Sequence, residues 1–90
     1  MKLVYDPLFV KQVKKVNVRV RRSTKHKLLI FAQDPDSPEL NNHSLSREWE
    51  GHRSIDITSD YRAIFEEVEI DGETVAYFVA LGSHKVLYKN

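Results

Sequence analysis

Residues 61–81 read YRAIFEEVEIDGETVAYFVAL and contain the most specific local signal of the chain. The strand-like runs Tyr61–Ile70 and Glu73–Leu81 flank the dipeptide Asp71-Gly72. A two-residue hairpin turn needs a positive φ at both central positions, which Asp and Gly tolerate. We therefore predict a β-hairpin in which the two runs pair antiparallel.

The sequence on either side of the hairpin adds shorter elements. Residues 53–58 alternate, with Arg53, Ile55 and Ile57 on one face, and this pattern predicts a further strand. Before it, Asp34 to Asn42 is a polar loop that contains two prolines. After the hairpin the chain closes with the short run Lys85–Tyr88.

The N-terminal third predicts a strand and two helices. Lys2–Tyr5 is strand-like, and Asp6 before Pro7 is a suitable N-cap for a helix that reaches about Val16. Val18–Gln33 shows both an alternating and a helical pattern, and we favour a second helix because the run is long and lacks Gly and Pro. The element order predicts one α+β domain over residues 1–90, with the helical pair on one face of a mainly antiparallel sheet of four or five strands.

Charge is divided unevenly along the chain. Residues 1–33 carry nine Lys/Arg and one acid (9 − 1 = +8), whereas residues 34–90 carry five Lys/Arg and twelve acids (5 − 12 = −7). A basic segment of this kind indicates a surface for a polyanion, although a solvated helix face has the same composition. The candidates for contacts with an RNA backbone are Lys14, Lys15, Arg21 and Arg22.

Several function classes are disfavoured by what the sequence lacks. It has no cysteine, and no apolar run approaches the roughly 20 residues that cross a bilayer. No signal-peptide pattern opens the chain, so we expect a cytoplasmic protein. With no HExxH, no histidine pair at helical i, i+4 spacing and no glycine-rich phosphate loop, we expect neither a metal nor a cofactor.

Polar residues of the C-terminal half include every group that metal-free RNA cleavage needs. A base takes the 2′-hydroxyl proton, an acid protonates the leaving 5′-oxygen, and cations stabilise the charged transition state. Exposed aromatic rings stack on unpaired bases. Plainer roles remain open, since Arg62 can pair with Asp56 or Asp60, and Trp49 can pack in the core. The set comprises His43, Trp49, Arg53, Asp56, Asp60, Tyr61, Arg62, His84, Lys85 and Tyr88.

Four motifs in chain order resemble the RelE/ParE toxin superfamily, and within it the YafQ-like branch. They are LNNHSL at 40–45, WEGHRSIDI at 49–57, DYRAIF at 60–65 and LGSHKVLY at 81–88. The resemblance covers the whole chain in length and element order. It implies a microbial RNase-like fold, ribosome-dependent cleavage of mRNA, and an antitoxin partner that inhibits the toxin and through which it oligomerises.

The resemblance also implies roles for single residues. His84 matches the histidine that is the best general-acid candidate, and Asp60 matches an acid that acts as base or orients a histidine. His43 matches the histidine of the loop before the sheet, and Arg62 matches a phosphate-binding arginine. The positions that would contact substrate are Tyr61, Tyr88, Arg53, Asp56 and Lys85.

Asp56 departs from the pattern, because YafQ-like toxins tend to carry a second histidine there. Its carboxylate could orient His43 or His84, but it would also repel the substrate phosphate.

Two alternatives follow from the resemblance: a ParE-like DNA gyrase inhibitor, and an attenuated or inactive family member. The presence of His84 favours the ribonuclease, since ParE-like chains usually lack that histidine.

Overall fold

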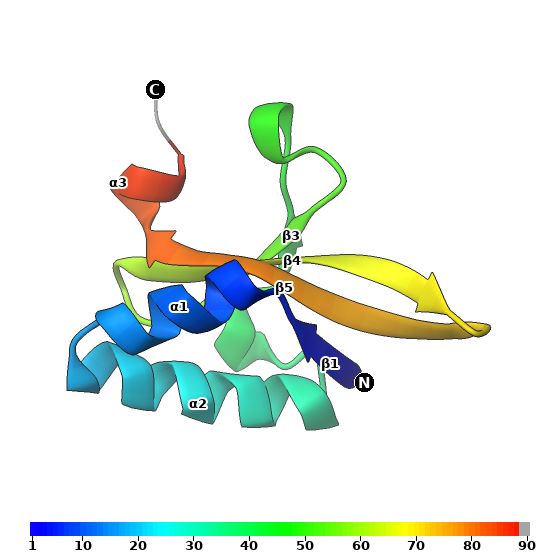
Figure 1. Cartoon of the computed structure of the whole chain (residues 1–90), viewed down its shortest axis with the longest axis horizontal. Helices are drawn as coiled ribbons and strands as arrows, with labels where there is room; N and C mark the ends of the chain where they lie inside the picture. The colour runs from blue at the N-terminus through cyan, green and yellow to red at the C-terminus, as the bar shows by residue number, and fades with distance from the viewer. Residues whose placement is uncertain (89–90) are drawn as a thin grey trace.

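The structure, a computed structural model, describes residues 1–88. The elements in chain order are β1 (Lys2–Tyr5), α1 (Pro7–Lys15), α2 (Val18–Gln33), the 3-10 turn η1 (Pro38–Leu40), β2 (His43–Ser44), the 3-10 turn η2 (Arg47–Trp49), β3 (Arg53–Asp56), β4 (Tyr61–Ile70), β5 (Glu73–Ser83) and α3 (His84–Leu87). Within the described residues the strands form one sheet in the order β1-β5-β4-β3-β2. Helices α1 and α2 lie side by side under one face of this sheet (Figure 1). The predicted fold class is confirmed.

Side-chain caps begin both long helices. The Asp6 carboxylate accepts a hydrogen bond from the Leu8 N–H at 2.9 Å, as the predicted N-cap of α1 does. The Asn17 side chain accepts from the Val20 N–H at 2.9 Å and so begins α2. The segment with two competing patterns is therefore a helix. None of the helices in residues 1–88 combines the length and the apolar character needed to cross a bilayer.

The predicted hairpin is the centre of the sheet. Asp71 and Gly72 have φ values of 52° and 78°, which makes the turn the type with two positive φ angles. β4 and β5 pair antiparallel from Ile70 opposite Glu73 to Tyr61 opposite Ser83. β1 runs parallel to β5 on its other side, and the remaining pairs are antiparallel.

The main core lies between the helices and the sheet. Phe31 of α2 packs edge-on against Phe65 and Phe78, with ring centroids 4.9 and 5.3 Å apart. Phe9 of α1 lies 5.5 Å from Phe78. These four side chains are at most 2% exposed, so the aromatic cluster joins both helices to β4 and β5.

The other face of the sheet, which we call the open face, carries Ser54 and Asp56 of β3 and Arg62 and Ile64 of β4. It has only a small core, in which Ile64, Ala80 and Leu87 are buried. Leu87 of α3 lies directly over Gly82, where a Cβ atom would come within 3.2 Å of its side chain. The glycine thus lets α3 fold back onto the sheet.

The structure refines four segments of the sequence analysis. The strand predicted over 53–58 ends at Asp56, and the loop from Asp34 to Asn42 contains η1, whose Leu40 is completely buried. The last run is the helical turn α3, because the Ser83 hydroxyl accepts a hydrogen bond from the Val86 N–H at 3.2 Å and caps it. The helix predicted to reach about Val16 ends one residue earlier.

Candidate active site on the open face of the sheet

The register of the sheet brings several predicted residues to the open face. Residues directly opposite each other on antiparallel strands project from the same face. Asp56 is opposite Arg62, and His43 is opposite Ser54. α3 and η2 stand on this side of the sheet, away from α1 and α2 (Figure 1).

Asp56 and Arg62 form an ion pair across β3 and β4. The Arg62 Nε lies 2.9 Å from the Asp56 Oδ1, and the two side chains are 17% and 29% exposed. The Oδ1 atom is buried and accepts no hydrogen bond, because its contact with Arg62 lacks the required alignment. The positive charge of Arg62 nevertheless compensates the negative charge of the carboxylate. The other oxygen, Oδ2, accepts a hydrogen bond from the Asn41 side chain at 3.3 Å. Asp56 therefore orients Arg62, whereas it makes no hydrogen bond or ion pair within residues 1–88 with His43 or His84, either of which it was expected to orient.

Arg62 is held further by backbone oxygens. Its Nη1 donates to the carbonyls of Thr58, Ser59 and Tyr61 at 3.0, 3.3 and 3.1 Å. Within the described residues its Nη2 makes no hydrogen bond. One edge of the guanidinium is thus fixed, and the remaining N–H groups are available to a phosphate oxygen.

His84 and Tyr88 lie at the two ends of α3. The His84 backbone N–H donates to the Asp60 carbonyl at 2.8 Å, which ties α3 to the start of β4. The exposed His84 ring packs edge-on against the Tyr88 ring at 4.6 Å. The Tyr88 hydroxyl donates to the buried Ser54 Oγ at 3.1 Å, so this ring is anchored to the open face.

His43 and Asp60 are exposed at the margins of the open face. His43 Nδ1 lies 2.8 Å from the Asn41 carbonyl, which can only accept, so Nδ1 carries the proton. In the neutral ring Nε2 then has a free lone pair, which is the form that a general base needs. The Asp60 side chain has no hydrogen-bond partner among residues 1–88, and the open choice of partner for Arg62 is resolved in favour of Asp56.

Two predicted substrate residues lie on the helical face of the sheet. Arg53 is opposite the core residue Phe65 and donates to the Asn42 side chain at 2.8 Å. Tyr61 packs against the main core. The structure therefore does not bring Arg53 or Tyr61 to the open face. Lys85 is exposed on α3, beside His84.

The predicted RNA-backbone residues lie on the helices below the sheet. Lys14 and Arg21 border an apolar groove between α1 and α2, and Arg22 faces a shallow surface with Val18 and His26. Arg21 also has a structural role, because its guanidinium donates to the Lys14 carbonyl at 3.1 Å and to another carbonyl at the end of α1. Lys15 is exposed at the last residue of that helix.

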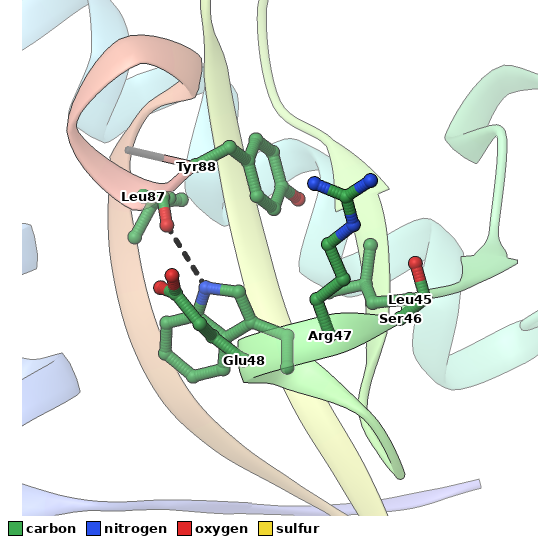
Figure 2. A pocket seen from close by; sticks show the side chains of 7 residues that line it. Leu45, Ser46, Arg47, Glu48, Leu87 and Tyr88 are labelled. Carbon is green, nitrogen blue, oxygen red and sulfur yellow. Dashed lines mark hydrogen bonds between the residues drawn. The ribbon is translucent and has the colours of Figure 1, made fainter. Parts of the chain in front are cut away.

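A cavity of about 490 Å³ opens between η2 and the end of α3. Figure 2 shows the Arg47 side chain extending toward Tyr88 across it. Trp49 packs against the small core, as one of its two predicted roles requires, and its indole N–H donates to the Leu87 carbonyl at 2.9 Å. The residues that line the cavity are Leu45, Ser46, Arg47, Glu48, Trp49, Leu87 and Tyr88.

Sequence reasoning missed Arg47 and Glu48, which no motif or charge run singles out. Arg47 has a φ of 58°, an unusual value for a residue other than glycine and one that only the structure reveals.

Metal ligands are not clustered in the part of the chain that the structure describes: no group of three or more His, Asp or Glu side chains is placed to hold an ion.

The layered arrangement, with a helical hairpin under one face and a short helix over the other, is the RelE/ParE-type toxin fold. The chain is similar to YafQ from E. coli strain BL21(DE3), with a TM-score of 0.76 and 21% identity over 97% of both chains. It is also similar to a YoeB/ParE toxin from Agrobacterium tumefaciens, with a TM-score of 0.72 and 16% identity over 93% of this chain and 99% of that one. A third similar structure is the toxin–antitoxin complex RelBE2 from Mycobacterium tuberculosis (TM-score 0.71, 14% identity, 92% and 96% of the two chains). No family model and no curated protein matches the sequence.

Proposed function

We propose that this chain is the toxin of a type II toxin–antitoxin pair, of the YafQ type, and that it cleaves mRNA on the ribosome as a metal-independent endoribonuclease. The observation that carries the proposal is the placement of Arg62, His84 and Tyr88 on one side of the sheet in a chain with this fold. Arginine, imidazole and an aromatic ring are the groups that bind a phosphate, transfer a proton and contact a base.

The reaction assigns one step to each group. A base removes the proton of the 2′-hydroxyl, and the 2′-oxygen attacks the adjacent phosphorus. The bond from phosphorus to the 5′-oxygen then breaks, and His84 protonates the leaving oxygen. His43 is the base that we favour, since Nε2 is its unprotonated atom, and Asp60 is the alternative. Arg62 stabilises the charge on the phosphate oxygens through its free N–H groups.

An antitoxin is the proposed protein partner. YafQ of E. coli has been solved in a DinJ–YafQ toxin–antitoxin complex, which matches this chain with a TM-score of 0.70 and 24% identity. The exposed apolar side chains of Leu8, Val18 and Leu29, which are 53–61% exposed on α1 and α2, are consistent with a surface that a partner protein covers. Ribosome binding through the basic helices and a cytoplasmic location belong to the same proposal.

The Asp56–Arg62 ion pair favours a second candidate, an attenuated toxin. A substrate phosphate must compete with a carboxylate that already neutralises Arg62. Slow or absent cleavage by a folded protein that still binds its antitoxin would support this candidate.

The test is induced expression without an antitoxin, followed by primer-extension mapping of mRNA ends. We expect growth arrest and new ends within translated messages. On a programmed ribosome His84→Gln should lower the single-turnover cleavage rate by about 10²–10⁴-fold, the usual loss for a proton-transfer group. His26→Gln on α2 is the matched control. Intact transcripts together with trapped gyrase–DNA complexes would instead establish a ParE-like inhibitor, and a wild-type rate for His84→Gln would refute the role of His84.

A further inference from the structure

We infer that the cavity between η2 and α3 is a subsite for one unpaired nucleotide of single-stranded RNA, in which Arg47 binds a phosphate and Glu48 reads the base. The inference rests on the proposed function, because it assigns to the RNA substrate a second binding position beside the reacting phosphate. Tyr88 belongs both to this cavity and to the open face, so the subsite adjoins the candidate active site.

Backbone hydrogen bonds close the turn that carries Arg47. The Leu45 N–H donates to the His52 carbonyl at 3.0 Å, and the Glu50 N–H donates to the Arg47 carbonyl at 3.0 Å. These bonds hold Arg47 at its φ of 58°, a conformation that side chains with a Cβ adopt rarely. Backbone conformations of this kind cluster at binding and active sites, where the surrounding structure maintains them.

The two walls of the cavity are tied together. The Trp49 indole N–H donates to the Leu87 carbonyl at 2.9 Å and so joins η2 to α3 (Figure 2). On its other side the Trp49 ring packs edge-on against His52 at 5.4 Å, and the His52 Nε2 lies 3.2 Å from a carboxylate oxygen of Glu66. The aromatic wall therefore keeps a fixed orientation before any ligand binds.

The charged groups of the cavity have no polar partners in the part of the chain that the structure describes. Within residues 1–88 neither the Arg47 guanidinium nor the Glu48 carboxylate makes a hydrogen bond or an ion pair. Both are exposed, and Figure 2 shows them apart, with Arg47 directed toward Tyr88 and Glu48 on the side of Leu87. A cation and an anion that stay separated in one cavity suit a ligand with an acceptor at one end and a donor at the other.

A nucleotide has this distribution of groups. Its phosphate accepts hydrogen bonds from a guanidinium, and its flat base stacks on aromatic rings such as those of Trp49 and Tyr88. A carboxylate only accepts, so Glu48 selects base edges that donate. Guanine presents two adjacent donors, N1–H and the 2-amino group, whereas uracil presents one, so we expect guanine to bind more tightly.

Trp49 is the single tryptophan of the chain, and its fluorescence therefore reports directly on this cavity. The probes are 2′-O-methyl trinucleotides of guanine or of uracil, which bind but cannot be cleaved. We expect a saturable fluorescence change, a tenfold or greater loss of affinity in Arg47→Gln, and a preference for guanine that Glu48→Gln removes. Lys2→Gln, which removes an exposed positive charge on β1, should bind as the wild type does, and circular dichroism checks that each variant is folded.

The outcomes separate this inference from the proposed function. Equal binding by the wild type and Arg47→Gln, or no response of Trp49 fluorescence, overturns the subsite even if the protein cleaves mRNA. Binding that depends on Arg47, in a protein that leaves mRNA intact on the ribosome, retains the subsite and refutes the nuclease. Dependence on Arg47 without a base preference upholds the phosphate contact and overturns the role of Glu48.

Discussion

The Asp56 carboxylate lies directly opposite Arg62 in the sheet, with Oδ1 at 2.9 Å from Nε. The pair fixes the guanidinium on the open face and at the same time reduces its net positive charge. Arg62 is thus positioned for a phosphate but partly neutralised before the substrate arrives.

Asp56→Asn should strengthen RNA binding by about two- to fivefold, since partly exposed ion pairs are worth at most about 1 kcal/mol. The charge of Arg62 would then act on the phosphate alone. The measurement is the dissociation constant of an uncleavable RNA at several salt concentrations, with Asp36→Asn in the exposed loop as the control. Weaker binding by Asp56→Asn would show that positioning of Arg62 matters more than its net charge.

Arg21→Gln should lower the free energy of unfolding by about 0.5–1.5 kcal/mol, the usual net value of a hydrogen bond. Its guanidinium holds the Lys14 and Val16 carbonyls at the end of α1. Arg22→Gln removes the same charge one residue away and should leave stability unchanged. Urea unfolding compares the two variants, and ribosome pelleting shows whether both weaken binding. Equal stability of both variants would contradict the capping role of Arg21.

Tyr88→Phe should destabilise the protein by about 1–3 kcal/mol, because the buried Ser54 hydroxyl loses its partner while the ring remains. In the Ser54→Ala background the same change should cost much less, since the hydrogen bond is already absent. Thermal and urea unfolding of the two single variants and the double variant complete this cycle. Additive losses would mean that the bond between the two hydroxyls contributes nothing.

Stability should depend on pH through Asp6 and Tyr77. The Tyr77 hydroxyl donates to the Asp6 carboxylate, and this bond, with the Leu8 N–H as a second cause, lowers the pKa of Asp6 from its ordinary 3.8. The same bond, followed by burial, raises the pKa of Tyr77 from its ordinary 10.0. Ionised Asp6 therefore stabilises the fold above about pH 3.8, and this contribution disappears as pH falls through the lowered pKa. Protonated Tyr77 stabilises the fold below about pH 10.0, and this contribution disappears as pH rises through the raised pKa.

Tyr77→Phe should reduce the loss of stability at both ends of the pH range. The measurement is the urea midpoint from pH 2 to 11. Tyr5→Phe is the control, because burial alone raises the pKa of Tyr5 and the change should leave the acid limb unaltered. An acid limb that is identical in the wild type and in Tyr77→Phe would rule out this coupling.

Much of the fold could be predicted because its signals are local. Short stretches of sequence specify the turn at Asp71-Gly72 and the cap at Asp6. Val18–Gln33 forms a helix because it contains no Gly or Pro to interrupt one. The end of the chain could not be assigned in this way. The sequence analysis left the conformation of the short run Lys85–Tyr88 open, and the cap at Ser83 and the packing of Leu87 over Gly82 make Lys85–Leu87 helical. The contact of Leu87 with Gly82 forms only when α3 folds back onto the sheet, and the order of residues alone does not reveal that reversal.

The site was predicted only in part, because motifs specify residue types and not sheet faces. Tyr61 and Arg62 are neighbours on one strand and must project to opposite faces, so the motif that contains both cannot bring both to a substrate. Arg53 lies opposite the core residue Phe65, so its side chain also projects from the helical face and not from the open face. Arg47 escaped notice because its backbone conformation comes from hydrogen bonds of the surrounding loop, which no spacing in the sequence encodes.

The pairing of β1 with β5 has a consequence for how the chain folds during synthesis. Lys2 lies opposite Val75, so the first strand has no partner until more than seventy residues have followed it. Phe78, which connects both helices to the sheet, comes from that same late strand. The emerging chain can form α1, α2 and isolated turns, but the aromatic core and the open face must close in one late, cooperative step, because contacts of long sequence separation form slowly. A nascent chain of this protein therefore remains without an assembled site until its last strand has left the ribosome.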